Sequence, residues 1–307
     1  MRPLPPVSVK PITVIGGANV DLCGSAAGPV IPKDSNPGRV RMTAGGVGRN
    51  IAESLARLGL PVRLLCALGR DEQGAFLDRQ CRQAGIDMSM TLYPAGGRTS
   101  CYLCLNDRDG DLLLAVSDME ICRSLTPRVL ETALPLLNDS ALCVLDANLP
   151  QETIEYLAHK LTVPLAADPV SVAKAPRLGP ALPRLAALKP NLPEARALTG
   201  LAEGDAPTAA QALHRMGVER VFLSLGAQGA YYLDREGGEA LPCLPGPVAD
   251  TTGCGDAFLA AALDGLVRGL PGRQSARCAL AAAALRAAGR PVSREAIGQA
   301  IKDGGVA

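Results

Sequence analysis

Short apolar runs recur along the chain, and longer segments of mixed polarity separate them. The first run, Ile12–Ile15, is followed by two glycines, and a second run spans residues 62–68. Apolar runs of this length that end at turn residues are typical of strands buried on both faces of a sheet. We expect further strands at residues 142–145, 165–167, 186–188, 220–224 and 230–233, and one more near Ala240.

The segments between these runs have the pattern of helices. Gly59 and Gly85 follow two of them, at the position where glycine commonly ends a helix. The expected helices span residues 49–58, 71–84, 151–160, 206–216, 256–268, 275–288 and 293–300, with one more beginning at Pro193. Strands that alternate with helices predict an α/β fold of three layers, in which helices cover both faces of a mostly parallel central sheet.

Two stretches, 19–44 and 97–118, fall outside this alternation. The second contains two strand-like segments, 99–105 and 111–116, on either side of a polar turn, which is a hairpin signal. We expect both stretches to form a small β-sheet lid over the carboxyl edge of the main sheet, where such folds bind ligands. The α/β core then comprises residues 12–18, 45–96 and 119–307, and the proline-rich residues 1–11 form a flexible leader.

Composition and charge exclude several classes of function. Aromatic residues make up 3% of the chain and tryptophan is absent, which does not suit a surface that stacks nucleic-acid bases. The 31 basic and 30 acidic residues are spread along the chain, so no basic groove for a phosphate backbone is indicated. No apolar stretch reaches the length of a membrane span, and the amino terminus has no apolar signal core. We therefore expect a cytoplasmic protein that binds neither membrane nor nucleic acid.

Most of the ten cysteines lie within apolar segments, as Cys66 and Cys143 do. Cysteines of this kind usually behave as small buried hydrophobic residues, and we expect free thiols in a reducing compartment. Cys101 and Cys104 form a C-x-x-C pair, but no second pair accompanies it. In a strand their side chains would point to opposite faces, so a metal or redox role is disfavoured.

The segment Asp-Thr-Thr-Gly-Cys-Gly-Asp-Ala-Phe at residues 250–258 carries the strongest chemical signal. Gly253 and Gly255 leave the backbone amides open, and the helix expected after them offers unpaired N–H groups and the positive end of its dipole. This combination forms an anion hole. Asp256 at the helix start is then a candidate general base for an attacking hydroxyl, because phosphoryl transfer needs positioning, charge neutralisation and a proton acceptor. The alternative for the segment alone is an ordinary capped helix.

A second motif, Gly-Gly-Val-Gly-Arg-Asn at residues 45–50, precedes the first by most of the chain. Together the two resemble, in order, the signatures of the ribokinase (PfkB) family of sugar and nucleoside kinases. The resemblance extends from Ile12 to about Ala288, although the family usually has alanine at Cys254. It implies an ATP-dependent phosphotransferase with the ribokinase-like fold. Its catalytic group is then Asp256, together with the anion hole of Gly253, Cys254 and Gly255.

The same resemblance implies a set of sugar-binding residues: Asn19, Asp21, Gly45, Gly46, Arg49, Asn50 and Asp256. An ionised aspartate such as Asp21 can accept hydrogen bonds from two hydroxyls at once, and such charge-assisted bonds are strong. The alternative for Asn19 and Asp21 is a turn that leaves the first strand, because both residue types favour turns.

For ATP, the resemblance points to Lys189, Asn191, Ser224, Gly226, Gly229, Thr251, Gly253 and Gly255. Asn191 and Glu194 resemble an N-x-x-E motif that orients Mg²⁺ through water, which suits an ion that keeps several water ligands. They could instead be only a helix start. Asp250 and Thr252 are candidates for a monovalent cation site (K⁺), and Asp168 either faces the phosphates or caps a strand.

Within the family, residues 34–40, the Arg49-Asn50 pair, Thr99-Ser100 and residues 117–119 resemble the members that phosphorylate pseudouridine. Thr99 and Ser100 would then hydrogen-bond the base. Ribose, fructose and adenosine remain alternative acceptors, and a non-catalytic binding protein is the alternative of another class. A dinucleotide-binding enzyme is disfavoured because no G-x-G-x-x-G follows the first strand. Exposed lid strands tend to pair with another chain, so we also expect a homodimer.

Overall fold

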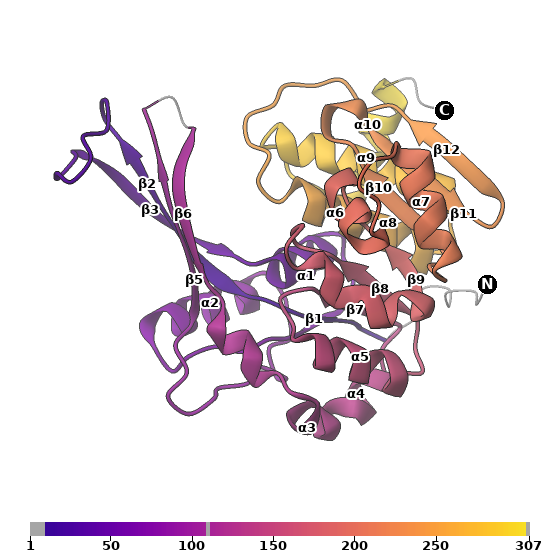
Figure 1. The fold of residues 1–307 in the computed structure, drawn as a ribbon, viewed down its shortest axis with the longest axis horizontal. Helices are drawn as coiled ribbons and strands as arrows, with labels where there is room; N and C mark the ends of the chain where they lie inside the picture. The colour runs from indigo at the N-terminus through magenta and orange to yellow at the C-terminus, as the bar shows by residue number, and fades with distance from the viewer. Residues whose placement is uncertain (1–9, 109–110, 305–307) are drawn as a thin grey trace.

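The computed structural model describes residues 10–108 and 111–304, and in these ranges the strands form a large and a small sheet (Figure 1). The large sheet has the strand order β12-β11-β10-β9-β8-β7-β1-β4. Its strands are β1 (Ile12–Ile15), β4 (Val62–Leu65), β7 (Leu142–Asp146), β8 (Leu165–Asp168), β9 (Leu185–Leu188), β10 (Val221–Ser224), β11 (Ala230–Asp234) and β12 (Gly237–Leu241). All neighbours from β10 to β4 are parallel, and β11 pairs antiparallel with β10 and β12.

Helices cover both faces of the large sheet, so the predicted three-layer α/β fold is confirmed. One face packs against α1 (Val47–Arg57), α2 (Glu72–Gln83), α8 (Cys254–Val267), α9 (Gly272–Ala287) and α10 (Arg294–Asp303). The other packs against α5 (Gln151–Lys160), η3 (Ala175–Arg184), α6 (Leu192–Thr199) and α7 (Ala206–Arg215). Alternation along β1 divides its side chains between the layers: Val14 belongs to the first apolar cluster and Ile15 to the second.

The small sheet has the order β3-β2-β5-β6 and rises away from the large sheet (Figure 1). Its strands are β2 (Asn19–Ala26), β3 (Gly38–Gly45), β5 (Ser100–Asn106) and β6 (Leu112–Asp118). They come from the two stretches that do not fit the strand–helix alternation, and β2 follows β1 after a turn of three residues. This connection places the base of the small sheet at the carboxyl end of β1.

The two faces of the small sheet differ in polarity. Asp21 and Thr43, which are partners in the β2–β3 register, line a cavity between this sheet and the core. The opposite face carries two rows of residues that follow the strand register across the sheet: Met42, Leu22, Leu103 and Val116 in one row, and Val40, Gly24, Leu105 and Leu114 in the next. Six of these residues are 38% to 78% exposed, so this face is an apolar surface: Val40, Met42, Leu103, Leu105, Leu114 and Val116.

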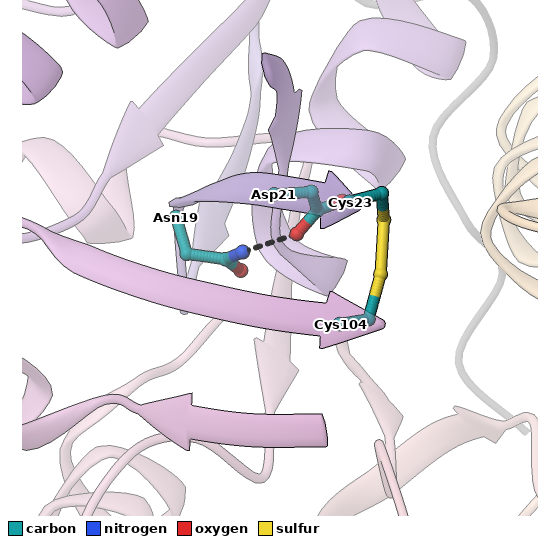
Figure 2. The surroundings of a disulfide bond; sticks show 4 residues. All are labelled: Asn19, Asp21, Cys23 and Cys104. Atoms are coloured by element: carbon teal, nitrogen blue, oxygen red, sulfur yellow. Dashed lines mark hydrogen bonds between the residues drawn. A yellow bond between two sulfur atoms is a disulfide. The ribbon is translucent and has the colours of Figure 1, made fainter. Parts of the chain in front are cut away.

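The expectation that the cysteines are free is wrong for two of them. A disulfide joins Cys23 of β2 to Cys104 of β5 across the small sheet (Figure 2), at a Cα–Cα distance of 4.8 Å. The two residues are partners in the parallel β2–β5 register, which brings together positions 81 residues apart. Local spacing carries no information about such a pairing. Cys101 is free, and it lies on the other side of β5 from Cys104, as strand alternation requires.

Several short helices were not expected from the sequence. They are η1 (Glu120–Ser124), α3 (Pro127–Leu130), η2 (Glu131–Ala133), α4 (Leu134–Asn138) and η4 (Gly226–Gln228), in addition to η3. Residues 1–9 of the expected leader lie outside the described residues. Within its last two positions, Lys10 pairs with Asp139 at 2.9 Å and the Pro11 carbonyl accepts a 2.9 Å hydrogen bond from Ala141. In the described ranges, no helix is long and apolar enough to cross a membrane.

Candidate active site

The carboxyl ends of six parallel strands lie at one edge of the large sheet, and the base of the small sheet lies at the same edge. β7 and β8 end at Asp146 and Asp168, and Lys189 directly follows β9. All three side chains are buried. Buried charges are costly unless they are paired, so this edge of the sheet is the natural place to look for chemistry.

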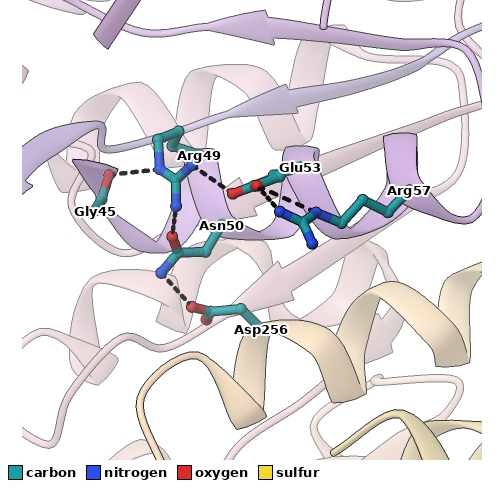
Figure 3. A network of polar contacts seen from close by, with 6 residues as sticks. All are labelled: Gly45, Arg49, Asn50, Glu53, Arg57 and Asp256. Atoms are coloured by element: carbon teal, nitrogen blue, oxygen red, sulfur yellow. Dashed lines mark hydrogen bonds and ion pairs between the residues drawn. The ribbon is translucent and has the colours of Figure 1, made fainter. Parts of the chain in front are cut away.

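The two sequence signatures meet at this edge. The side-chain amide of Asn50, on α1, donates a 2.7 Å hydrogen bond to Asp256, on α8 (Figure 3). Arg49 is buried, and its guanidinium donates to the Gly45 carbonyl at 3.0 Å and to the Asn50 amide oxygen. It also pairs with Glu53 at 2.6 Å. Because Arg49 occupies the amide oxygen of Asn50, the amide nitrogen is the group that faces Asp256.

Asp256 is buried in the first turn of α8, and its surroundings raise the pKa of its carboxyl to about 7. Burial is the largest cause, and the negative charge of Asp168 adds to it. The ammonium of Lys189 and the hydrogen bond from Asn50 act in the opposite direction. A general base with a pKa near neutrality is matched to proton transfer at physiological pH.

Lys189 lies between two acidic groups. Its ammonium pairs with Asp168 at 2.9 Å, and both side chains are less than a tenth exposed. Burial alone would lower the pKa of Lys189, but the charges of Asp168 and Asp256 raise it above its ordinary value. Lys189 therefore remains a cation within the site, and its Nζ lies 2.8 Å from the position that a β-carbon on Gly255 would occupy.

The residues of the predicted anion hole lie at the start of α8. This helix begins at Cys254, two residues earlier than expected, so Asp256 lies within its first turn. Gly253 is the N-cap residue in the left-handed region, with φ of 75°, a conformation that favours glycine. The Cys254 amide donates to the Thr251 carbonyl at 3.2 Å, which leaves the amides of Gly255 and Asp256 as the first-turn donors for an anion.

Of the predicted sugar-binding residues, Asp21, Arg49 and Asn50 line one cavity of about 780 Å³ between the small sheet and the core, together with Gly253. The others do not contribute to this lining, but each forms a hydrogen bond with one of the three: Asn19, Gly45, Gly46 and Asp256. Asn19 donates a 2.6 Å hydrogen bond to Asp21 (Figure 2). Burial raises the pKa of Asp21, although Asn19 and the charge of Arg49 favour its ionised form.

The turn before α1 requires glycine at position 46. The φ of Gly46 is 98°, and a β-carbon there would lie 2.6 Å from the carbonyl oxygen of Gly17. The neighbouring Gly45 ends β3, opposite Asn19 in the register. The first signature thus packs its backbone directly against the turn that leads into β2.

Thr99 and Ser100 lie at the start of β5 and are both buried. Thr99 donates to Asp71 at 2.6 Å through its hydroxyl and at 2.8 Å through its amide, and its hydroxyl accepts from the Gly69 amide. These contacts fasten the base of the small sheet to the N-cap of α2. Ser100 is the partner of Asn19 in the β2–β5 register, so it lies on the same face of the small sheet as Asp21, but it does not contribute to the lining of the 780 Å³ cavity.

The predicted ATP and Mg²⁺ residues other than Thr251, Gly253 and Gly255 lie at or close after the ends of β9 and β10. Asn191 caps α6, where its side chain accepts from the Glu194 amide at 2.9 Å and Glu194 accepts from the Asn191 amide at 2.9 Å. Ser224, the last residue of β10, forms an isolated parallel β-bridge with Asn191. The turn that contains Gly226 and Gly229 follows Ser224 in the sequence. Asn191 and Glu194 therefore form a capping box at the start of α6, which leaves one Glu194 oxygen without a described partner.

A carboxylate with one remaining acceptor oxygen fits a hydrogen bond to a water of hydrated Mg²⁺, although not direct coordination by a full protein cage. Among the described residues, no group of three or more His, Cys, Asp or Glu side chains could hold a metal ion by itself. Asp250 and Thr252 lie in an exposed turn closed by a 2.8 Å hydrogen bond from the Thr252 amide to Asp250.

Sequence reasoning missed Asp146, which is fully buried at the end of β7. One of its oxygens accepts from the amides of Gly17 at 2.8 Å and Gly48 at 2.9 Å, and the other accepts from the amide of Asn148 at 2.9 Å. Asp146 thereby joins the turn after β1 to the start of α1. Its signal in the sequence is weak, because a single aspartate that follows an apolar run is also the ordinary end of a strand.

Lys174 was also missed. Its ammonium donates a 2.6 Å hydrogen bond to Asn148, and its pKa is lowered, with burial as the main cause. Lys174, Asn148, Arg177 and Glu152 contribute to the lining of a second cavity of about 390 Å³. This cavity lies directly beyond Gly17, since a β-carbon on Gly17 would lie 2.7 Å from the Asn148 amide nitrogen.

Comparison with known proteins agrees with this geometry. The family model for pfkB family carbohydrate kinases matches residues 10–291. The pseudouridine kinase of Escherichia coli K12 is 36% identical over 274 residues, which cover 87% of each chain. The chain belongs to the pfkB family of carbohydrate kinases. It is therefore a phosphotransferase whose acceptor is an alcohol group of a sugar or nucleoside, and kinases of this family use ATP.

Solved structures give the same result for the fold. A carbohydrate kinase from Agrobacterium tumefaciens superimposes with a TM-score of 0.86 at 32% identity, covering 96% of this chain and 97% of that one. Arabidopsis thaliana ribokinase, solved with ribose and ATP, gives a TM-score of 0.84 at 22% identity, covering 96% and 99%. The predicted ribokinase-like fold is thus confirmed.

Proposed function

We propose that this enzyme transfers the γ-phosphoryl group of ATP to the 5′-hydroxyl of pseudouridine. The observation that carries the chemistry is the buried Asp256 carboxylate, held by Asn50 at 2.7 Å at the edge of the cavity that Asp21 and Gly253 line. Asp256 accepts the hydroxyl proton as the 5′ oxygen bonds to the γ phosphorus, and the bond from that phosphorus to the bridging oxygen of ADP breaks. The products are ADP and pseudouridine 5′-phosphate.

The phosphates require positive charge and amide donors along their path. The first-turn amides of α8 would contact the transferring group, and Lys189 supplies a buried cation beside them. Asn191, Ser224, Gly226, Gly229 and Thr251 would hold the rest of the nucleotide. Bound Mg²⁺ would neutralise phosphate charge, with Glu194 and Asn191 orienting its waters. A monovalent cation such as K⁺ would bind near Asp250 and Thr252.

A nucleoside acceptor is favoured by the second cavity. Asn19 and Asp21 would bind the ribose, and the 390 Å³ cavity beyond Gly17 then has room for a base. Its lining offers donors from Lys174 and Arg177 and an acceptor from Glu152. A uracil edge presents both carbonyl acceptors and N–H donors, and pseudouridine exposes one more ring N–H than uridine. The similarity to the E. coli enzyme supports the same substrate.

The small sheet would act as the lid of the site, with Thr99 and Ser100 at its base on the substrate side. Its apolar surface needs a partner, because exposed apolar faces of this extent usually mark protein contacts. A second copy of the chain offers the same surface and satisfies the symmetry of a twofold dimer. We therefore include a homodimer formed through the small sheets in the proposal, and a cytoplasmic location with it.

The test is ADP release with Mg·ATP over pseudouridine, uridine, adenosine, ribose and fructose. Strong turnover with pseudouridine and little with uridine supports both the chemistry and the reading of the base. Turnover with ribose or fructose alone would retain Asp256 in its role and reject pseudouridine as substrate. Absence of turnover across the panel, with ATP binding intact, would favour a non-catalytic role or an acceptor outside the panel.

A further inference from the structure

Arg286, in the last turn of α9, lies directly against residues 250–255, the turn and helix start of α8 that are here called the anion loop. Its Nε is 3.4 Å from the position that a β-carbon on Gly253 would occupy, and one terminal nitrogen is 3.7 Å from the same point. Arg286 and Gly253 both line the 780 Å³ cavity that contains Asn50. The guanidinium is therefore beside the first turn of α8, where the transferring phosphoryl group would lie.

The guanidinium of Arg286 is half-buried but has no hydrogen bond or ion pair with another side chain or carbonyl in the part of the chain that the structure describes. Arg49 and Arg57, which line the same cavity, both pair with Glu53 at 2.6 Å. A guanidinium has five N–H donors in a fixed planar arrangement, which suits two oxygens of a phosphate. Arg286 is thus a cation whose donors remain available in the reaction cavity.

Its position is fixed by packing. α9 packs along α8 over most of its length, and buried residues of both helices, such as Ala281 and Ala261, belong to one apolar cluster. The charge of Arg286 already acts on the loop: it helps hold the pKa of Asp250 below its ordinary value, although burial acts in the opposite direction. A cation at a helix C-terminus can also serve only to stabilise the helix dipole. Arg290, just beyond the same helix end, is exposed and also contributes to the lining of the 780 Å³ cavity, but it has the charge without the contact to Gly253.

We propose that Arg286 is a catalytic residue that binds an oxygen of the phosphoryl group during transfer and neutralises the charge that develops there. The proposal rests on the kinase function proposed above. Charge on the equatorial oxygens of the phosphoryl group is greatest during transfer, and an arginine supplied by the same chain needs no partner protein to complete the site. Arg286 would act together with Lys189, which reaches the loop from the other side at Gly255.

The experiment compares Arg286→Ala, Arg286→Lys and the matched control Arg290→Ala. We expect kcat of Arg286→Ala to fall about 100-fold or more, as for loss of a cation that acts in the transition state. KM for the acceptor and the affinity for ATP, measured by calorimetry, should change by less than about threefold. Arg290→Ala should keep kcat close to that of the wild type. Guanidinium chloride at low millimolar concentration should restore part of the activity of Arg286→Ala and none of that of Arg290→Ala.

Three results would overturn the proposal: an unchanged kcat for Arg286→Ala, an equal loss for Arg290→Ala, or a loss that guanidinium does not relieve. If Arg286→Ala does not fold, Arg286→Lys must show the fall in kcat. The slow hydrolysis of ATP without acceptor is measured in the same variants, because it needs the phosphoryl site but not pseudouridine. A fall in hydrolysis on loss of Arg286 would support its role even if no panel acceptor is phosphorylated, so failure of the proposed substrate and failure of this proposal remain distinguishable.

Discussion

The amide of Asn50 and the carboxylate of Asp256 are 206 positions apart in the sequence and 2.7 Å apart in the structure. Each belongs to one of the two signatures, so this hydrogen bond is the point where α1 and α8 join to make a site. Asn50 can donate to Asp256 because Arg49 holds its amide oxygen. The arginine before the asparagine therefore sets the direction of the bond that the Asp256 carboxylate receives.

The raised pKa of Asp256 predicts a pH dependence of the reaction. A base must be deprotonated to act, so log kcat/KM for the acceptor, which reports the free enzyme, should rise with a slope of one up to about pH 7 and level off above it. Asp168→Asn removes a negative charge that raises this pKa and should move the midpoint to lower pH. A flat profile between pH 5 and 8 would show that Asp256 is not the titrating base.

Asp256→Asn separates catalysis from stability. We expect kcat to fall by about two to four orders of magnitude while ATP still binds, because only the proton acceptor is lost. The folded protein holds extra protons on Asp256 between its ordinary pKa of 3.8 and about 7, so this group makes the wild type less stable as pH rises through that range. The variant should therefore melt at a higher temperature than the wild type at pH 8, and this gain should shrink toward pH 4. Near-normal turnover would remove Asp256 from its role.

The fold could be predicted largely from the sequence, because buried parallel strands and the helices between them leave a strong local pattern. β1 and α5 span the expected residues. The short helices of residues 120–138 and η3 were not predicted, because the former are three to five residues long and η3 contains Pro180 and Pro183, which are ordinarily helix breakers. Contacts that depend on topology were also out of reach. The disulfide of Cys23 with Cys104 depends on strand order, which no local pattern specifies.

The site residues also fall into those that the sequence could predict and those that it could not. Residues in continuous motifs, such as Asn50 and Asp256, could be found because the motif itself is local. Asp146, Lys174 and Arg286 stand alone in ordinary segments, and only the fold brings them to the cavities. Their importance follows from burial and from the atoms they contact, neither of which a single sequence displays.

Asp146→Asn tests the buried aspartate that joins the turn after β1 to α1. An amide in place of one oxygen would direct N–H donors at the amides of Gly17, Gly48 or Asn148 and leave at least one of them unpaired. We expect a loss of about 1–3 kcal/mol in the free energy of unfolding. We also expect a higher KM for the acceptor, because Asn19 follows this turn. Urea unfolding and steady-state kinetics measure the two effects. Asp139→Asn, at an exposed ion pair, is the control and should change neither.

Lys174→Met tests whether the 390 Å³ cavity binds the base of the nucleoside and distinguishes it by hydrogen bonds. Methionine keeps an unbranched side chain, one heavy atom shorter, and removes the donors, so KM for pseudouridine should rise about 10-fold or more from the loss of a hydrogen bond to a charged group. Any turnover of ribose, which has no base, should stay unchanged. The control is Lys160→Met, at the exposed end of α5. An equal effect on ribose and pseudouridine would instead assign Lys174 a structural role through Asn148.

The apolar surface of the small sheet predicts the oligomeric state. Leu114 is 63% exposed and Val116 is 57% exposed on β6, and both lie in rows that cross all four strands. Burial of such a surface against a second copy removes apolar area from water, at about 25 cal/mol per Å². Aspartate at Leu114 would place a charge in that contact, with little effect on the fold because the side chain is already exposed.

Leu114→Asp should therefore convert a dimer to a monomer in size-exclusion chromatography with light scattering, while the melting temperature at low protein concentration changes little. Leu136→Asp is the matched control, because Leu136 is 49% exposed on α4, on the core and away from the small sheet. A wild-type chain that is monomeric at micromolar concentration would contradict the dimer, and a dimer that survives Leu114→Asp would place its contact elsewhere. If the dimer steadies the lid over the substrate, the monomeric variant should also show a higher KM for the acceptor with an unchanged affinity for ATP.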